Sequence, residues 1–265
     1  MAETDANEFL LGAAANGCIE GVKRALEAGA DIDFDPLENW SPGDDTSLPP
    51  CTALHFACGT GQLDLVRLLL RKGASLVKRS IGASAPLHSA ASNGKTQVVD
   101  LLVQHGATVD IRDGFQDTPL MSACYCKQVD TVRRLIELGA RPDLTDGYIG
   151  QKLRIEDDNQ DSVEESVKLI QEARKSKLLR CCNPKCGKPG YRKTGTLKLC
   201  GRCKLTRYCS RDCQKQHWSV GHKKCCGHDL CSIEGSDHFQ LAQKVHMYAA
   251  ERQQGLSEFG INLAV

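Results

Sequence analysis

Cysteine and histidine residues crowd into the last third of this 265-residue chain, which contains 15 cysteines in all. Residues 200–226 alone hold six cysteines and two histidines. Pairs of these residues recur at short spacings, C-x2-C, C-x3-C and H-x3-C, that suit the ligands of structural zinc. Thiolates are soft ligands that select zinc over hard cations, and no carboxylate lies among the candidate ligands. The pattern therefore predicts zinc binding.

Eight well-spaced ligands are enough for two closed four-ligand sites. A closed site lacks the open coordination position that catalytic zinc keeps for water, so both ions are predicted to be structural. Cys181 competes with Cys182 as the first ligand, and Cys225 competes with Cys226 as the last. The candidate ligands are Cys182, Cys186, Cys200, Cys203, Cys209, Cys213, His222 and Cys226.

The N-terminus, MAETDANEFLLGAAANG, has acidic flanks and no basic start, which does not fit a secretory signal. No apolar run approaches the roughly 18 residues that a membrane span needs. We therefore expect a cytoplasmic and/or nuclear protein with no membrane partner. Thiols stay reduced in these compartments, which favours metal binding over disulfides.

The motifs C-G-R-C, R-Y-C-S-R-D-C-Q, H-W and H-K-K-C in residues 182–226 resemble those of a MYND-type zinc finger. The resemblance implies a cross-braced fold in which Cys182 and Cys186 share one zinc with Cys209 and Cys213. The other four ligands would then hold the second zinc. The segment before His222 is one residue longer than the commonest spacing of the family, with Gly221 as the extra residue.

The resemblance also implies a docking groove for proline-containing peptides, lined by Gln214 and Trp218. An indole offers a flat apolar face to a proline ring, and a preformed polyproline segment loses little entropy on docking. Gly201 stands where a small polar residue can join this groove in the family, which leaves that contact in doubt. His217, beside Trp218, matches a position that does not bind metal.

The front of the chain repeats with a period of 33 residues, as shown by Leu54, Leu87 and Leu120. Starts of the form T-x-L-H or x-P-L-H and ends of the form L-L-x-x-G-A resemble ankyrin repeats. The resemblance covers residues 7–172 and implies a mainly α solenoid of four to five repeats, the fifth degraded. One repeat cannot bury its apolar stripe alone, so the copies must stack.

Such a stack offers an extended surface for binding a partner protein and does not by itself suggest catalysis. Phe115 and Tyr148 are apolar where turn tips are normally polar, and Trp40 lies in an acidic insertion, residues 31–50. We predict that these three residues bind a partner. His55 and His88 occupy the structural histidine position of the repeat, so we do not expect them to be ligands.

Charge divides the chain into an acidic front and a basic back. Residues 1–172 carry 16 basic and 27 acidic residues, whereas residues 173–226 carry 16 basic residues and only Asp212 as an acid. We predict an ankyrin-repeat domain (7–172), a basic connector (173–181), the zinc finger (182–226) and a tail (227–265) with a helix at 237–253. The segment SVEESVKLIQEARKSKLL, residues 162–179, predicts one helix that runs toward the finger.

The leading hypothesis is a non-enzymatic adaptor, in which the stack and the zinc module each dock a partner protein, as a transcriptional or chromatin co-regulator does. The alternative is nucleic-acid binding by the basic half, although no base-reading helix is evident. MYND fingers occur in lysine methyltransferases, but the chain has no room for a further catalytic domain, so it would at most target such an enzyme. We found no phosphate loop or nucleophile elbow and expect no small-molecule substrate.

Overall fold

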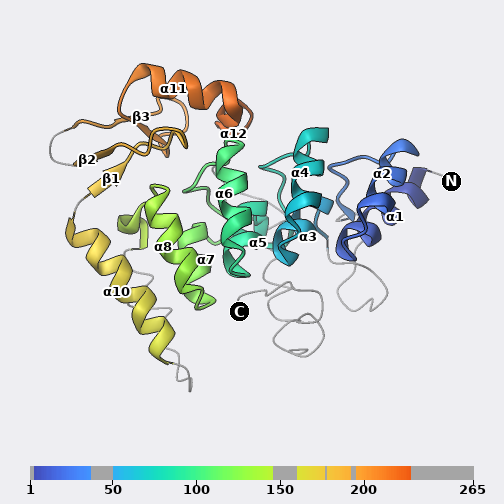
Figure 1. Ribbon diagram of the computed structural model, residues 1–265, viewed down its shortest axis with the longest axis horizontal. Helices are drawn as coiled ribbons and strands as arrows, with labels where there is room; N and C mark the ends of the chain where they lie inside the picture. Colours follow the sequence, from blue (N-terminus) through green and yellow to red (C-terminus); the bar gives the residue numbers. More distant parts are fainter. Residues whose placement is uncertain (1–2, 37–49, 146–159, 177, 192–194, 228–265) are drawn as a thin grey trace.

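The computed structural model describes residues 3–36, 50–145, 160–176, 178–191 and 195–227, and it is built mainly from helices (Figure 1). Four helix pairs come first, followed by a longer helix and a small module of short strands and helices. The four pairs are α1 (Glu3–Ala15) with α2 (Ile19–Glu27), α3 (Ala53–Thr60) with α4 (Leu63–Lys72), α5 (Pro86–Ser92) with α6 (Thr96–Gln104), and α7 (Pro119–Tyr125) with α8 (Val129–Glu137).

Local sequence signals set the ends of these helices. The first helix of the second repeat begins at Thr52, where the Thr52 amide donates to Nδ1 of His55 at 3.3 Å. The other ring nitrogen, Nε2, lies 3.1 Å from the carbonyl oxygen of Ser84 in the next repeat. The second helices end at glycines with left-handed backbone, such as Gly73 at φ 99°. His55 is therefore a structural link between repeats, as its position in the motif predicted.

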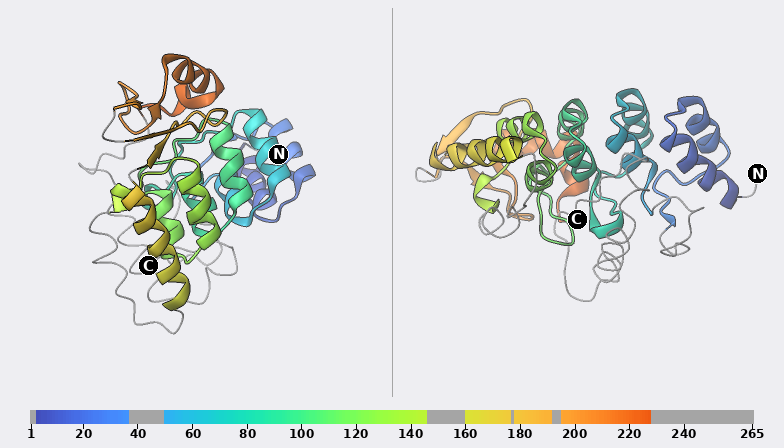
Figure 2. Two further views of the ribbon diagram at one scale, coloured as in Figure 1. Left: turned by 60° about the vertical axis from the view of Figure 1, so that its left-hand side comes forward. Right: turned by 90° about the horizontal axis from the view of Figure 1, so that it is seen from below.

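The four pairs stack side by side and share one continuous core (Figure 2). Leu54, Leu87 and Leu120, which stand 33 residues apart, are each almost fully buried in it. Short 3-10 helices lie in the connections at η2 (Ile81–Ala83) and η3 (Pro142–Thr145). The mainly α fold with an ankyrin solenoid is thus confirmed.

Helix α10 (Gln160–Ser176) packs against α8 and closes the C-terminal end of the stack. Its buried residues Ser166 and Ile170 face the repeats. The expectation that this helix continues toward residue 179 is wrong. The chain changes to the strand β1 (Leu178–Arg180), because these residues pair with β2 (Pro189–Tyr191) of the zinc module.

The small module contains two separate two-stranded antiparallel sheets, β1–β2 and β3 (Lys198–Leu199) with β4 (Arg207–Tyr208). Three helical segments follow: α11 (Arg211–His217), the π-helical turn η5 (Trp218–His222), which is kinked at Gly221, and α12 (Lys223–Cys225). Ser210 caps α11, since its hydroxyl accepts from the Cys213 amide at 3.1 Å. Among the described residues, no helix is long and apolar enough to cross a membrane.

Candidate metal centre

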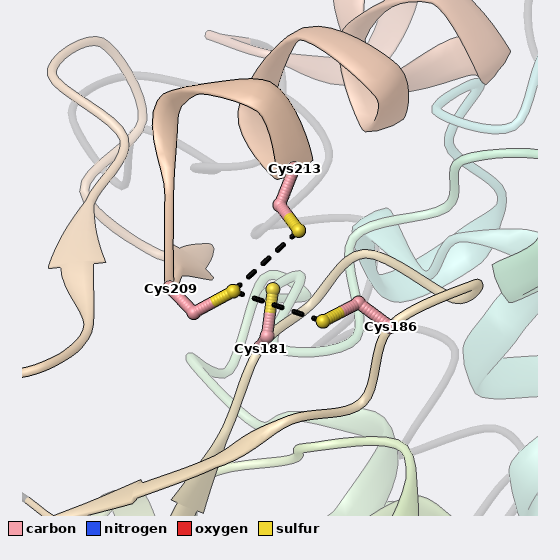
Figure 3. Close-up of side chains that lie close together, drawn as sticks. All are labelled: Cys181, Cys186, Cys209 and Cys213. Atoms are coloured by element: carbon pink, nitrogen blue, oxygen red, sulfur yellow. Dashed lines mark hydrogen bonds between the residues drawn. The ribbon is translucent and has the colours of Figure 1, made fainter.

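The first cluster brings together four thiols from three segments of the module (Figure 3). Cys181 directly follows β1, Cys186 lies in the loop before β2, and Cys209 and Cys213 lie at the start of the helical turns. Sγ of Cys209 is 3.7 Å from Sγ of Cys186 and 3.5 Å from Sγ of Cys213. All four sulfur atoms lie within 4.8 Å of one another.

The second cluster consists of Cys200, Cys203, His222 and Cys226, all of them buried. Sγ of Cys200 lies 3.7 Å from Sγ of Cys226, and Sγ of Cys203 lies 3.6 Å from Nε2 of His222. The turn that carries the first pair is closed by the Lys204 amide, which donates to the Cys200 carbonyl at 3.0 Å. Cys225, the competing candidate, is buried outside this cluster.

These separations fit tetrahedral zinc. With Zn–S bonds of about 2.3 Å, two sulfur ligands of a tetrahedron lie about 3.8 Å apart, and a sulfur and a nitrogen ligand lie about 3.5 Å apart. The measured values, 3.5–3.7 Å between sulfurs and 3.6 Å from sulfur to nitrogen, lie close to both. A disulfide requires about 2.05 Å between sulfurs, so these pairs are not disulfide-bonded. The two clusters fit two structural zinc ions.

The structure places Cys181 in the first cluster, where the sequence placed Cys182. Cys182 instead pairs with Arg207 of β4: its amide donates to the Arg207 carbonyl at 2.8 Å, and the Arg207 amide donates to its sulfur at 3.3 Å. The Cys181 amide donates to the carbonyl of Lys188 at 3.0 Å. Adjacent residues of an extended segment point to opposite sides, so only one of the two thiols can face the cluster.

Each cluster contains one thiol whose pKa is lowered, Cys213 in the first and Cys200 in the second, beside thiols whose pKa is raised. Burial works to raise the pKa of the Cys213 thiol, but hydrogen bonds with Ser210 and Asn183 and with its neighbours in the cluster together lower this pKa to about 7. Burial raises the pKa of the Cys226 thiol in the second cluster to about 12. Thiols must lose their protons to bind zinc, so metal binding to these clusters releases protons.

The predicted peptide-docking residues lie on the helical turns beside the second cluster. The Trp218 indole is half-buried, with its ring centroid 5.9 Å from that of His222 in an edge-on arrangement. Gln214 is half-buried one turn earlier, and the Trp218 amide donates to its carbonyl. His217 is fully buried, lies 2.9 Å from the Tyr208 hydroxyl through Nδ1, and stacks on His222 outside either cluster.

The remaining predicted partner residues belong to the repeats. Phe115 is 39% exposed at a turn tip between α6 and α7, where its amide donates to Asp113. Trp40 and Tyr148 lie outside the described residues, as does the helix predicted at 237–253. Phe115 lies on the repeat stack, whereas Gln214 and Trp218 lie on the finger.

Comparison with protein families gives two matches. A family model described as ankyrin repeats (3 copies) matches residues 10–113 and 77–146, which together make up more than half of the chain. The chain belongs to the ankyrin-repeat proteins. A second model, described as MYND finger, matches residues 171–226. No curated protein matches the chain.

Ankyrin repeats and MYND fingers generally mediate protein–protein interactions and are typically non-catalytic. This ankyrin-repeat protein is thus built as a zinc-containing protein-interaction module. The MYND finger lies along one edge of the stack, beside the ends of α6 and α8 (Figures 1 and 2).

Two glycines meet where the finger contacts the stack. A Cβ atom added at Gly106 would lie 2.6 Å from the Cα of Gly221 and 2.7 Å from the amide nitrogen of His222. A Cβ atom added at Gly221 would collide with the carbonyl oxygen of His105. The same edge of the stack continues at Gly139, where an added Cβ would lie 3.4 Å from that of Arg180.

Charged groups surround the rest of this contact. Asp110 of the stack is buried, and its carboxylate accepts from the Arg141 amide at 2.8 Å. Burial raises the pKa of this carboxyl to about 6, although the hydrogen bond and charge of Arg141 and the charge of Arg207 from the finger act to lower it. Arg207 acts in the same way on Asp143. Arg207 is thus attracted by Asp110 and Asp143 of the stack and repelled by Arg141, and burial together with this repulsion lowers the pKa of Arg207.

Sequence reasoning missed this contact between the modules. Gly106 was recognised only as the helix-ending glycine of its repeat, and Gly221 only as an extra residue. The one available signal was that extra residue, which the structure accommodates in the π-helical turn η5. The partners of Arg207 follow from the tertiary fold, and no local pattern in the sequence indicates them.

Proposed function

We propose that this protein is a non-enzymatic adaptor whose repeat stack and MYND finger each dock a partner protein. Two structural zinc ions would hold the finger in shape, one bound by Cys181, Cys186, Cys209 and Cys213, and the other by Cys200, Cys203, His222 and Cys226. The observation that carries the proposal is the direct contact between Gly106 and Gly221, which fixes two interaction modules against each other.

On the finger, Gln214 and Trp218 are the proposed docking residues for a proline-containing peptide. Trp218 packs partly against the core of the finger. A proline ring could stack on the part of the indole that stays exposed. Val220, two residues on, is 38% exposed. On the stack, Phe115 is the proposed apolar contact at the turn tips.

Affinity purification followed by mass spectrometry tests this function with the full chain. Trp218→Ala should lose a subset of the recovered proteins, while Phe9→Ala in α1, at the opposite end of the stack from the finger, serves as a matched loss of a partly exposed aromatic side chain. Zinc content, measured by mass spectrometry of the metal, must stay at two ions in both variants. Identical partner sets for wild type and Trp218→Ala would refute the docking role of the finger. The co-regulator role further requires that the lost proteins be nuclear.

A further inference from the structure

A hollow on the outer face of the stack is not accounted for by the two docking sites proposed above. It has a volume of about 550 Å³ and is lined by residues of α2, α4 and α6. Along the row of second helices, α4 packs closely on α6, and α6 packs closely on α8. Helix α2 packs less closely on α4, and the hollow lies at this looser junction. The lining residues are Ile19, Lys23, Asp64, Arg67, Leu68, Arg71, Leu101 and His105.

The floor of the hollow is apolar and its rim is basic. Leu68 and Leu101 are each 8% exposed, and Ile19 is half-buried beside them. Lys23, Arg67, Arg71 and His105 are opposed by one acidic lining residue, Asp64. This basic rim lies on a half of the chain that is acidic as a whole, with 27 acidic and 16 basic residues in positions 1–172.

The cations of the rim are open to an external partner. Lys23 pairs with Glu20 at 2.6 Å and Arg67 with Asp64 at 3.2 Å, but all four side chains are at least 44% exposed, and such pairs contribute little stability. Arg71 donates from Nε to the Arg67 carbonyl. Within the described part of the chain, no acidic side chain forms an ion pair with Arg71.

One residue of the rim, His105, contacts the MYND finger. Its Nδ1–H donates to the Leu101 carbonyl, and its own carbonyl lies against Gly221. The hollow therefore ends where the stack meets the finger, and its lining cations all belong to the stack.

We propose that this hollow binds an acidic polypeptide segment whose apolar side chains enter between Leu68 and Leu101 while its carboxylates meet Lys23, Arg67 and Arg71. This inference rests on the proposed adaptor function and adds a third docking surface. The apolar floor and the volume suit a few aliphatic side chains. None of the lining residues is Phe, Tyr or Trp, so the hollow lacks the large aromatic rings on which bases of a single-stranded nucleic acid stack.

A displayed library of random 16-residue peptides, sorted on the zinc-loaded full chain, tests the proposal without a known ligand. Arg71→Glu reverses a charge inside the hollow, and Lys72→Glu makes the same change on the next, equally exposed residue of α4, which does not line it. Peptides should emerge that lose about tenfold or more in affinity on Arg71→Glu and less than about twofold on Lys72→Glu. Their compositions should be net negative, with apolar residues three or four positions apart.

Three outcomes would overturn the proposal: no enriched peptide depends on Arg71, the dependent peptides are not acidic, or Lys72→Glu weakens them equally. A single-stranded oligonucleotide that binds more tightly than the peptides, and in an Arg71-dependent way, would assign the hollow to nucleic acid instead. The adaptor function is judged separately, because loss of partners on Trp218→Ala would stand even if Arg71→Glu changed nothing.

Discussion

Replacing Gly106 by alanine should detach the MYND finger from the repeat stack, and the chain supplies its own control. Gly73 holds the equivalent position one repeat earlier, with the same backbone φ of 99°. A Cβ atom at Gly73 would meet nothing within 4 Å, whereas one at Gly106 would meet Gly221 and His222 of the finger. The two substitutions therefore share the backbone cost and differ only in the collision.

The expected sizes follow from these contacts. Left-handed backbone costs an alanine roughly 1–2 kcal/mol, which applies to both variants. The Cβ atom of Gly106→Ala would lie 2.6 Å from Gly221, so the finger must move by about 0.8 Å to reach the 3.4 Å at which ordinary contact begins. Overpacking of this kind costs roughly 1–3 kcal/mol. Gly106→Ala should thus destabilise the protein by about 2–5 kcal/mol, and Gly73→Ala by about 1–2 kcal/mol.

Urea unfolding of the zinc-loaded chain, followed by circular dichroism, measures the free energy of each variant. Hydrogen exchange then locates the change, since amides of residues 218–226 should exchange faster in Gly106→Ala and remain as in wild type in Gly73→Ala. If both variants unfold at the same urea concentration, and neither alters exchange at 218–226, the glycine contact does not hold the modules together.

Two further predictions concern the zinc ligands and the repeat histidines. Cys181→Ser should lower the bound zinc measured by metal mass spectrometry from two ions to one, whereas Cys182→Ser should retain both; the reverse result would restore Cys182 as the ligand. Burial lowers the pKa of the His55 and His88 imidazoles to about 4, so the native state excludes a proton that the unfolded chain binds below about pH 6.5, and stability falls as the pH drops from 6.5 toward 4. Between pH 7 and pH 5 the loss is about 2 kcal/mol per histidine, and the raised pKa of Asp110 offsets about 1 kcal/mol of the total. Urea unfolding at both pH values checks this, because His88→Gln should lose about 2 kcal/mol less than wild type over the same interval, and equal losses would contradict the assignment.

The repeats could be predicted because each one is specified locally. A threonine or proline start, an interior run of small residues, an apolar stripe and a final glycine fix a helix pair without knowledge of the rest of the chain. The C-terminal end of α10 could not be predicted in the same way. It depends on strand pairing between Leu178–Arg180 and Pro189–Tyr191. Helical periodicity in residues 162–179 could not reveal a competing partner ten residues further on.

The choice between Cys181 and Cys182 shows a similar limit within the metal centre. Spacing rules admit both thiols, because they concern only the number of residues between ligands. The structure decides through the hydrogen bonds of the two amides, one to Lys188 and the other to Arg207, which set the side of the chain on which each thiol lies. Those partners are 7 and 25 residues away, so the decision is made by tertiary structure.

The extra residue before His222 joins the metal centre to the contact between the modules. Cys213 and His222 are held by different clusters, so an additional residue between them would turn His222 away from its cluster unless the helix absorbed it. The turn Trp218–His222 accommodates it by widening to a π-helical turn that is kinked at Gly221, and Gly221 lies against the stack. The stack presents Gly106 there, a position that already requires glycine because of its left-handed backbone. Gly106, which ends a repeat, and Gly221, the extra residue of the finger, therefore meet with no side chain between them. His222 directly follows Gly221 and belongs to the second cluster, so it couples this contact to the metal centre.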